Sequence, residues 1–221
     1  MPIRFQVWGD YALFTRLEMK TERVSYDIIT PSAARGICDA IFWHPGLRWV
    51  IDRIIVCNPI RFTSVRRNEV KAVVNSRAAR TVMEGRGKGP LYIATPNEIQ
   101  QRASLLLRDV SYVIEAHFEM TDQAAPSDNP GKFQDIMTRR IRKGQAYHQP
   151  YMGCREFPAH FAPCETLPPC PEELKGRRDL GYMLYDMDYS DPKDIRPLFF
   201  RAVLEDGVLT VPPRDSKEVI G

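Results

Sequence analysis

The segment from residue 112 to residue 120 combines a strand-like pattern with a residue that titrates near neutral pH. Its strict alternation predicts a strand with one face in the core and one in solvent. The apolar face would consist of Tyr112, Ile114, Ala116, Phe118 and Met120. His117 then lies on the solvent face between Glu115 and Glu119, where it can act as a general acid or base. The alternative is a surface histidine without a chemical role, because a titratable group is only a probabilistic sign of a site.

Positive charge is concentrated in residues 1–170, which hold 23 Lys/Arg and 17 Asp/Glu, whereas residues 171–221 hold 8 and 11. Two clusters of one sign stand out within this part of the chain. The first contains Arg61, Arg66, Arg67, Lys71, Arg77 and Arg80, and the second contains Lys132, Arg139, Arg140, Arg142 and Lys143. Such clusters are typical of a surface that binds a polyphosphate, although a solvated helix or loop has the same composition.

Length and composition are those of an ordinary globular protein, with 221 residues, 43% hydrophobic and 27% charged. No apolar run approaches the roughly 20 residues of a membrane span, and no signal-peptide pattern opens the chain. The five cysteines are scattered and odd in number. They indicate reduced thiols and a cytoplasmic location.

One group of metal-binding residue types falls between residues 148 and 170. Its members are His148, Cys154, His160, Cys164 and Cys170. The group lacks the paired spacing of a structural zinc motif, so we expect neither a metal nor a cofactor.

Two strands are expected before the His117 strand. Alternation at residues 3–7 predicts the first, and an apolar, β-branched run at residues 49–56 predicts the second, which continues to about Phe62. Residues 64–100 have no clear pattern and are expected to be irregular, with a glycine-rich basic loop at residues 85–90. This loop matches neither a phosphate-binding Walker loop nor a dinucleotide fingerprint.

Two helices are expected from their capping signals. Thr30 and Asn129 are each followed by proline, which places an N-cap before a proline in the first turn. We expect the first helix to run from Ser32 to about Trp43 and the second to end at Gly144.

The C-terminal part follows a proline-rich linker that begins at residue 163. Residues 182–189 and 198–211 are expected to be strands, and the second folds into a hairpin at Asp206-Gly207. The order β-α-β, insertion, β-α-β indicates an α+β protein with a ferredoxin-like N-terminal domain. The expected domains are residues 1–162, with an insertion at 64–100, and a small β-rich C-terminal extension at 163–221. RNA-recognition modules share this fold.

Several segments together resemble the type I-C CRISPR-associated protein of the Cas-five family, subtype d, over essentially the whole chain. They are residues 7–16, 22–36, 59–69, 101–103, 112–119, 153–158 and 178–183. The resemblance implies an endoribonuclease that cuts the repeat hairpin of precursor CRISPR RNA without a metal. It also implies that the protein stays on the 5′ handle beside the filament-forming and large subunits of the interference complex, with possible contact to target DNA. The alternative is a structural subunit that only binds the 5′ handle.

The catalytic set implied by the resemblance is a tyrosine, a lysine and a histidine. The histidine corresponds to His117, but the lysine falls on Ala116 and the tyrosine on Phe42, and His44 stands where a lysine is expected. Other cations or phenols would have to replace them. The RNA-binding candidates are Lys20, Arg23, Tyr26, Arg35, Arg61, Arg66, Arg67, Arg139 and Arg140. We also expect strand edges such as residues 198–211 to pair with another subunit.

Overall fold

The computed structural model describes residues 2–19, 21–87 and 89–221. Contacts divide the chain into two units, of which the larger comprises residues 1–63 and 105–221 and the smaller residues 64–104. The C-terminal residues therefore belong to the same unit as the N-terminal residues.

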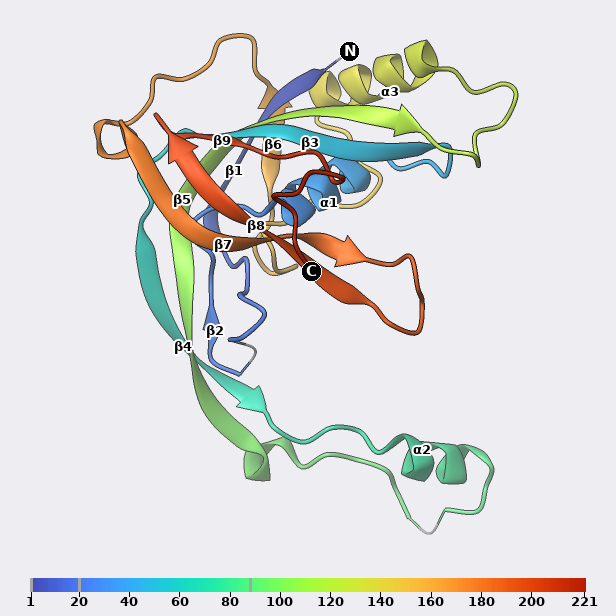
Figure 1. The fold of residues 1–221 in the computed structure, drawn as a ribbon. Helices are drawn as coiled ribbons and strands as arrows, with labels where there is room; N and C mark the ends of the chain where they lie inside the picture. Colours follow the sequence, from blue (N-terminus) through green and yellow to red (C-terminus); the bar gives the residue numbers. More distant parts are fainter. Residues whose placement is uncertain (1, 20, 88) are drawn as a thin grey trace. The chain divides into compact units, whose positions relative to one another are not determined.

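A large antiparallel sheet forms the larger unit (Figure 1). Its strand order is β6-β1-β5-β3-β9-β8-β7, and β2 and β4 pair with β5 beside this path. The strand bounds are β1 Ile3–Ala12, β2 Arg23–Val24, β3 Leu47–Val56, β4 Phe62–Val70, β5 Ile99–Met120, β6 His160–Pro163, β7 Arg177–Asp188, β8 Arg196–Glu205 and β9 Val208–Thr210. The mixed α/β class is confirmed.

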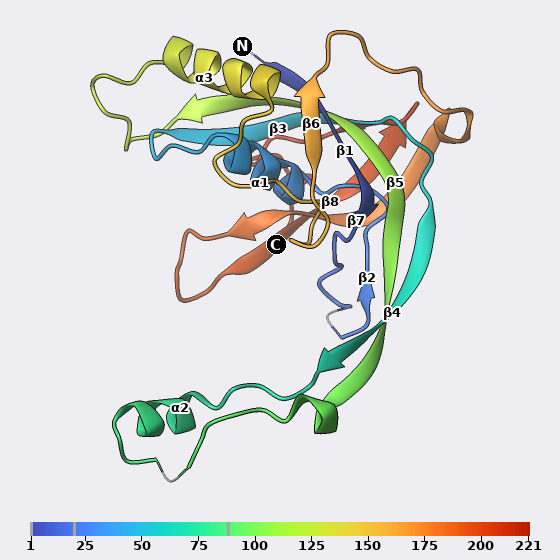
Figure 2. The ribbon, with the colours of Figure 1, turned by 180° about the vertical axis from the view of Figure 1, so that it is seen from behind.

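Both long helices begin where their caps predict. Helix α1 (Pro31–Ile41) is capped by Thr30, whose hydroxyl accepts from the Ala33 amide at 3.2 Å. Helix α3 (Pro130–Lys143) is capped by Asn129 and ends at Gly144, which is left-handed with φ 61°. Glycine adopts that conformation without steric cost, so it terminates the helix. Helix α1 lies between β3 and β7, as Figures 1 and 2 show from opposite sides.

The helix-facing side of the sheet forms the core. Ile114 and Ala116 of β5 are fully buried on this side. Phe118 continues the same face, because its ring packs 5.4 Å from that of Trp49 and 6.1 Å from that of Phe133 on α3. His117 lies on the opposite face, since side chains alternate along a strand.

The prediction of solvent along that whole opposite face is wrong. Val113 is 0% exposed and Glu115 only 6%. Arg4 of β1 and Arg53 of β3 bond the Glu115 carboxylate and cover this part of the face. Alternation along one strand cannot reveal such a cover. Only the end of the face that carries His117 is half exposed.

The smaller unit is more regular than the sequence predicts. Its first residues belong to β4, and helix α2 (Ser76–Met83) and the 3-10 turn η1 (Thr95–Asn97) follow. Asn75 caps α2 by accepting from two backbone amides. The amide of Lys71 donates to the carbonyl of Glu98 at 3.0 Å, which joins the two sides of the unit. The strand escaped prediction because backbone pairing with β5 forms it, and no apolar alternation accompanies that pairing.

The hairpin at Asp206-Gly207 is confirmed. Both residues have positive φ, 48° and 75°, as a tight two-residue turn requires. The expectation of a free edge at residues 198–211 is wrong, because β8 lies between β7 and β9, and Phe199 exchanges two backbone hydrogen bonds with Ile220. Strand β9 joins this hairpin to β3, so the C-terminal strands complete the main sheet.

Candidate functional site

His117 projects from β5 toward a carboxylate on β3. Its Nδ1 lies 2.8 Å and 3.0 Å from the two carboxylate oxygens of Asp52. The side chains are 39% and 37% exposed, so a large solute can reach them from solvent. Among the described residues, Nε2 of the ring makes no hydrogen bond. In this pair, Asp52 fixes Nδ1 of the His117 ring, and Nε2 is left without a hydrogen-bond partner among the described residues.

A bulge in β3 brings Asp52 to this position. Ile51 pairs with Ala116 and Arg53 pairs with Glu115, so Asp52 is the extra residue between two adjacent partners on β5. Bulges redirect a side chain and are frequent beside active sites. The Asp52 carbonyl accepts a 3.0 Å bond from the Val211 amide, which ties the bulge to the chain after β9.

Two ion-pair groups flank His117 along the strands. Arg48 bonds Glu119 at 2.6 Å on one side. On the other side Glu115 receives bonds from both Arg4 and Arg53, each at 2.7 Å. Cross-strand residues offset by two positions lie about 7–8 Å apart, within reach of a long arginine side chain. Three guanidinium groups therefore lie within a few strand positions of His117, and each is paired with a carboxylate.

Sequence reasoning missed four residues of this arrangement: Arg4, Arg48, Asp52 and Arg53. Alternation of Leu47, Trp49 and Ile51 with Arg48 places Arg48 on the polar face of β3. The bulge at Asp52 has no comparable local signal, because it depends on the register between β3 and β5.

Several predicted RNA-binding residues are buried or form ion pairs within the fold. Arg35 bonds Asp186 of β7 at 2.9 Å and 3.0 Å and Asp39 at 3.0 Å. Burial alone would lower the Arg35 pKa, but these carboxylates raise it. Tyr26 is 2% exposed, burial raises its phenol pKa, and the Arg16 guanidinium covers its ring at 4.7 Å. A side chain this buried does not reach RNA, which argues against the prediction for Tyr26.

The two arginines predicted on α3 differ in environment. Arg140 donates to the Ile41 carbonyl at the end of α1 and lies 5.2 Å from the centroid of the Phe42 ring. Arg139 is exposed. Both line a groove of about 530 Å³ whose other walls are Gly144, Gln145, Ala146, Gln149 and Phe161. Guanidinium and amide donors of this kind suit phosphate or base edges.

The remaining candidates differ in exposure. Arg61 and Arg66 are exposed, whereas Arg23 and Arg67 are partly buried. Arg66 and Arg67 belong to the smaller unit. Lys20 lies outside the described residues.

Three positions at which the resemblance implies other residues lie in packed or hydrogen-bonded places. Ala116 is 0% exposed on the helix side of β5, where a lysine would be buried. Phe42 is 5% exposed and packs 5.7 Å from the Phe133 ring, on the side of the sheet opposite His117. His44 is held by its loop, because its Nδ1 accepts from the Gly46 amide at 3.0 Å.

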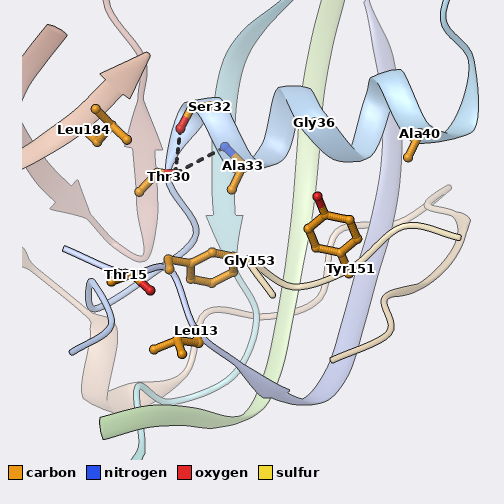
Figure 3. Close-up of a pocket in the computed structure, with 11 residues that line it drawn as sticks. Leu13, Thr15, Thr30, Ser32, Ala33, Gly36, Ala40, Tyr151, Gly153 and Leu184 are labelled. Atoms are coloured by element: carbon orange, nitrogen blue, oxygen red, sulfur yellow. Dashed lines mark hydrogen bonds between the residues drawn. The ribbon is translucent and has the colours of Figure 1, made fainter. Parts of the chain in front are cut away.

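A cavity of about 350 Å³ beside the start of α1 is a separate feature (Figure 3). Apolar groups and the hydroxyls of Thr15, Thr30, Ser32 and Tyr151 line it. Figure 3 shows that the Thr30 hydroxyl is committed to Ser32 and to the Ala33 amide. No lining residue is charged, so the cavity is poorly suited to a phosphate.

Residues 2–19, 21–87 and 89–221 contain neither a cluster of metal ligands nor a membrane-spanning helix. No group of three or more His, Cys, Asp or Glu side chains there is arranged to hold a metal ion. Among the same residues, no helix has the length and apolar character of a membrane span. All five cysteines are free thiols.

Comparison with known proteins identifies close relatives in sequence. The model of a family described as CRISPR-associated protein (Cas_Cas5) matches residues 3–212. The CRISPR pre-crRNA endoribonuclease Cas5d of Mannheimia succiniciproducens is 50% identical, over 98% of this chain and 97% of that protein. The protein of the same name from Thermus thermophilus is 37% identical, over 98% of this chain and 94% of that protein.

Solved structures share the fold at lower identity. A crystal structure of a CRISPR-associated protein superposes with a TM-score of 0.69 at 22% identity, covering 100% of this chain and 97% of the other. A chain of a CRISPR RNA-guided surveillance complex superposes with a TM-score of 0.51 at 13% identity, covering 95% and 90%. These likenesses concern the fold alone.

Proposed function

The chain belongs to the Cas5d family of CRISPR-associated proteins, and from this membership we propose that it is an endoribonuclease that cuts precursor CRISPR RNA. The 50% identity to a pre-crRNA endoribonuclease along nearly the whole of both chains carries this conclusion. The half-exposed His117 supplies a group suited to the chemistry.

We propose that His117 moves a proton during cleavage. The 2′-hydroxyl next to the scissile phosphate loses its proton and its oxygen attacks the phosphorus. The bond to the 5′-oxygen breaks, and that oxygen takes up a proton. The products are a 2′,3′-cyclic phosphate and a 5′-hydroxyl. A positioned histidine contributes about 10²–10⁴-fold to such a reaction.

The proposed substrate is the repeat hairpin, and the proposed product complex is the protein on the 5′ handle. The exposed Arg61, Arg66 and Arg139 would bind phosphates. The strand order β6-β1-β5-β3, with α1 after β1 and α3 after β5, supports a ferredoxin-like arrangement of the kind RNA-recognition modules use. The shared fold with a chain of a surveillance complex supports assembly with filament-forming and large subunits, next to target DNA.

The test is a cleavage assay in EDTA with purified protein and a labelled repeat hairpin. We expect cutting at one position and products with the ends named above. A hairpin with a 2′-deoxy nucleotide at the scissile position is the matched control, and it should bind and resist cutting. Cleavage of the deoxy substrate at the same rate would contradict attack by the 2′-hydroxyl.

A structural subunit that binds the 5′ handle without cutting is the second candidate. The absence of the expected tyrosine and lysine at Phe42 and Ala116 favours it. In the same assay such a protein would bind both hairpins equally and leave both intact.

A further inference from the structure

We infer that Asp52 is a positioning residue that sets the tautomer and the orientation of the His117 ring. This inference rests on the proposed role of His117 in cleavage. It concerns a residue on another strand, redirected toward the ring by the bulge in β3.

The hydrogen bond decides which ring nitrogen carries the proton. An ionised carboxylate only accepts, so Nδ1 at 2.8 Å and 3.0 Å from the Asp52 oxygens must donate. In the neutral ring the lone pair is then on Nε2, which no described group occupies. This tautomer presents a proton acceptor to a bound 2′-hydroxyl.

Asp52 differs from the neighbouring carboxylates in its partner, which is a histidine and not an arginine. Glu115 is held by Arg4 and Arg53, and Glu119 by Arg48. Within the described part of the chain, the Asp52 carboxylate bonds only to His117, although arginines stand on both sides of it. One carboxylate on this face, that of Asp52, is therefore available to orient the histidine ring.

The backbone holds the carboxylate in place independently of the side-chain bond. Asp52 occupies the extra position of the bulge, and its carbonyl accepts from the Val211 amide at 3.0 Å. A change confined to the side chain therefore leaves the bulge anchored, so Asp52→Asn alters the bond to the ring with little change to the fold.

The experiment compares Asp52→Asn and Asp52→Glu with the wild type under single-turnover conditions. We expect Asp52→Asn to cut about 10²-fold more slowly, at the lower end of what a general base contributes, with hairpin affinity within about threefold. Asp52→Glu should recover part of the rate. Asp179→Asn is the matched control, because Asp179 makes a similar half-exposed pair with Arg201 on the distant β7–β8 hairpin. It should cut at the wild-type rate.

A second measurement reads the tautomer directly and does not depend on cleavage. The ¹⁵N chemical shifts of the His117 ring should show the proton on Nδ1 in the wild type and a mixture of tautomers in Asp52→Asn. Unchanged shifts together with an unchanged rate would overturn the role of Asp52. If His117→Ala itself cuts normally, the failure lies in the proposed function of His117, and the ring shifts still decide whether Asp52 sets the tautomer.

Discussion

Two neighbouring charged groups on the same face of β5 have opposite environments. Glu115 is 6% exposed, and arginines from β1 and β3 clamp both of its oxygens. His117, two residues further, is half exposed, and its one hydrogen-bond partner among the described residues is Asp52. The first arrangement engages both carboxylate oxygens in ion pairs, and the second leaves a ring nitrogen available. Burial and the number of partners, not residue type, therefore distinguish a structural charge from a reactive one.

The arginines show the same distinction. Arg35 and Arg140 are committed to groups within the fold, whereas Arg66 and Arg139 are exposed. If the distinction is correct, substitutions in the committed set change stability, and substitutions in the available set change cleavage or binding.

The largest expected effect is on cleavage by His117→Ala. The single-turnover rate should fall by about 10²–10⁴-fold, because the proton-transfer group is removed. Hairpin affinity should stay within about threefold, since a tenfold change requires about 1.4 kcal/mol. His160→Ala, at an exposed histidine on β6, is the control and should keep its rate. A wild-type rate in His117→Ala would show that His117, like Glu115, has only a structural role.

Glu115→Gln tests the other side of the comparison. It removes a buried charge and leaves two arginines without their carboxylate, so we expect a loss of about 2 kcal/mol in the free energy of unfolding, below the value for fully buried pairs because both arginines are partly exposed. Urea denaturation measures the loss. Glu119→Gln breaks the exposed pair with Arg48 and should cost less than about 1 kcal/mol. Equal losses in the two variants would mean that burial does not separate these charges.

The double substitution of Arg66 and Arg67 by alanine extends the comparison to RNA binding. Each lost phosphate contact should lower the slope of log affinity against log salt by roughly 0.7–0.9. Affinity measured across a salt series gives the slope, and Arg196→Ala on β8 should leave it unchanged. A wild-type slope in the double variant would show that these arginines do not contact the RNA backbone.

The smallest effects should separate Arg139 from its neighbour Arg140. Arg140→Ala loses a hydrogen bond to α1 and a cation–π contact, which should cost about 1 kcal/mol of stability. Arg139→Ala should leave stability within about 0.5 kcal/mol and weaken hairpin binding about threefold, the effect of one exposed contact. Thermal unfolding and a binding titration of the two variants decide the matter. A stability loss in Arg139→Ala together with a binding loss in Arg140→Ala would contradict the proposed division of the arginines.

Local signals were sufficient for the two long helices and for the hairpin turn. Thr30, Asn129 and Gly144 act within a few residues of their own positions, so the sequence predicted α1, α3 and their boundaries to within about two residues. The turn at Asp206-Gly207 was predictable for the same reason.

Features that depend on distant parts of the chain were not predictable. The burial of Glu115 depends on Arg4 of β1 and Arg53 of β3, and the position of Asp52 depends on the register between β3 and β5. His117 was found because its half-exposed position follows from alternation on its own strand. Its partner was missed because a bulge breaks that alternation.

The bond from the Val211 amide to the Asp52 carbonyl has a consequence for the timing of folding. Within the described part of the chain, β5 pairs with one edge of β3, and β9, which comes late in the sequence, pairs with the other edge. During synthesis, at about 5–20 residues per second, this edge stays unpaired for on the order of ten seconds after β3 emerges. We therefore expect the nascent chain to expose an open strand until its final residues appear. Slower translation of the C-terminal region would lengthen the period in which that edge can pair with another chain and aggregate.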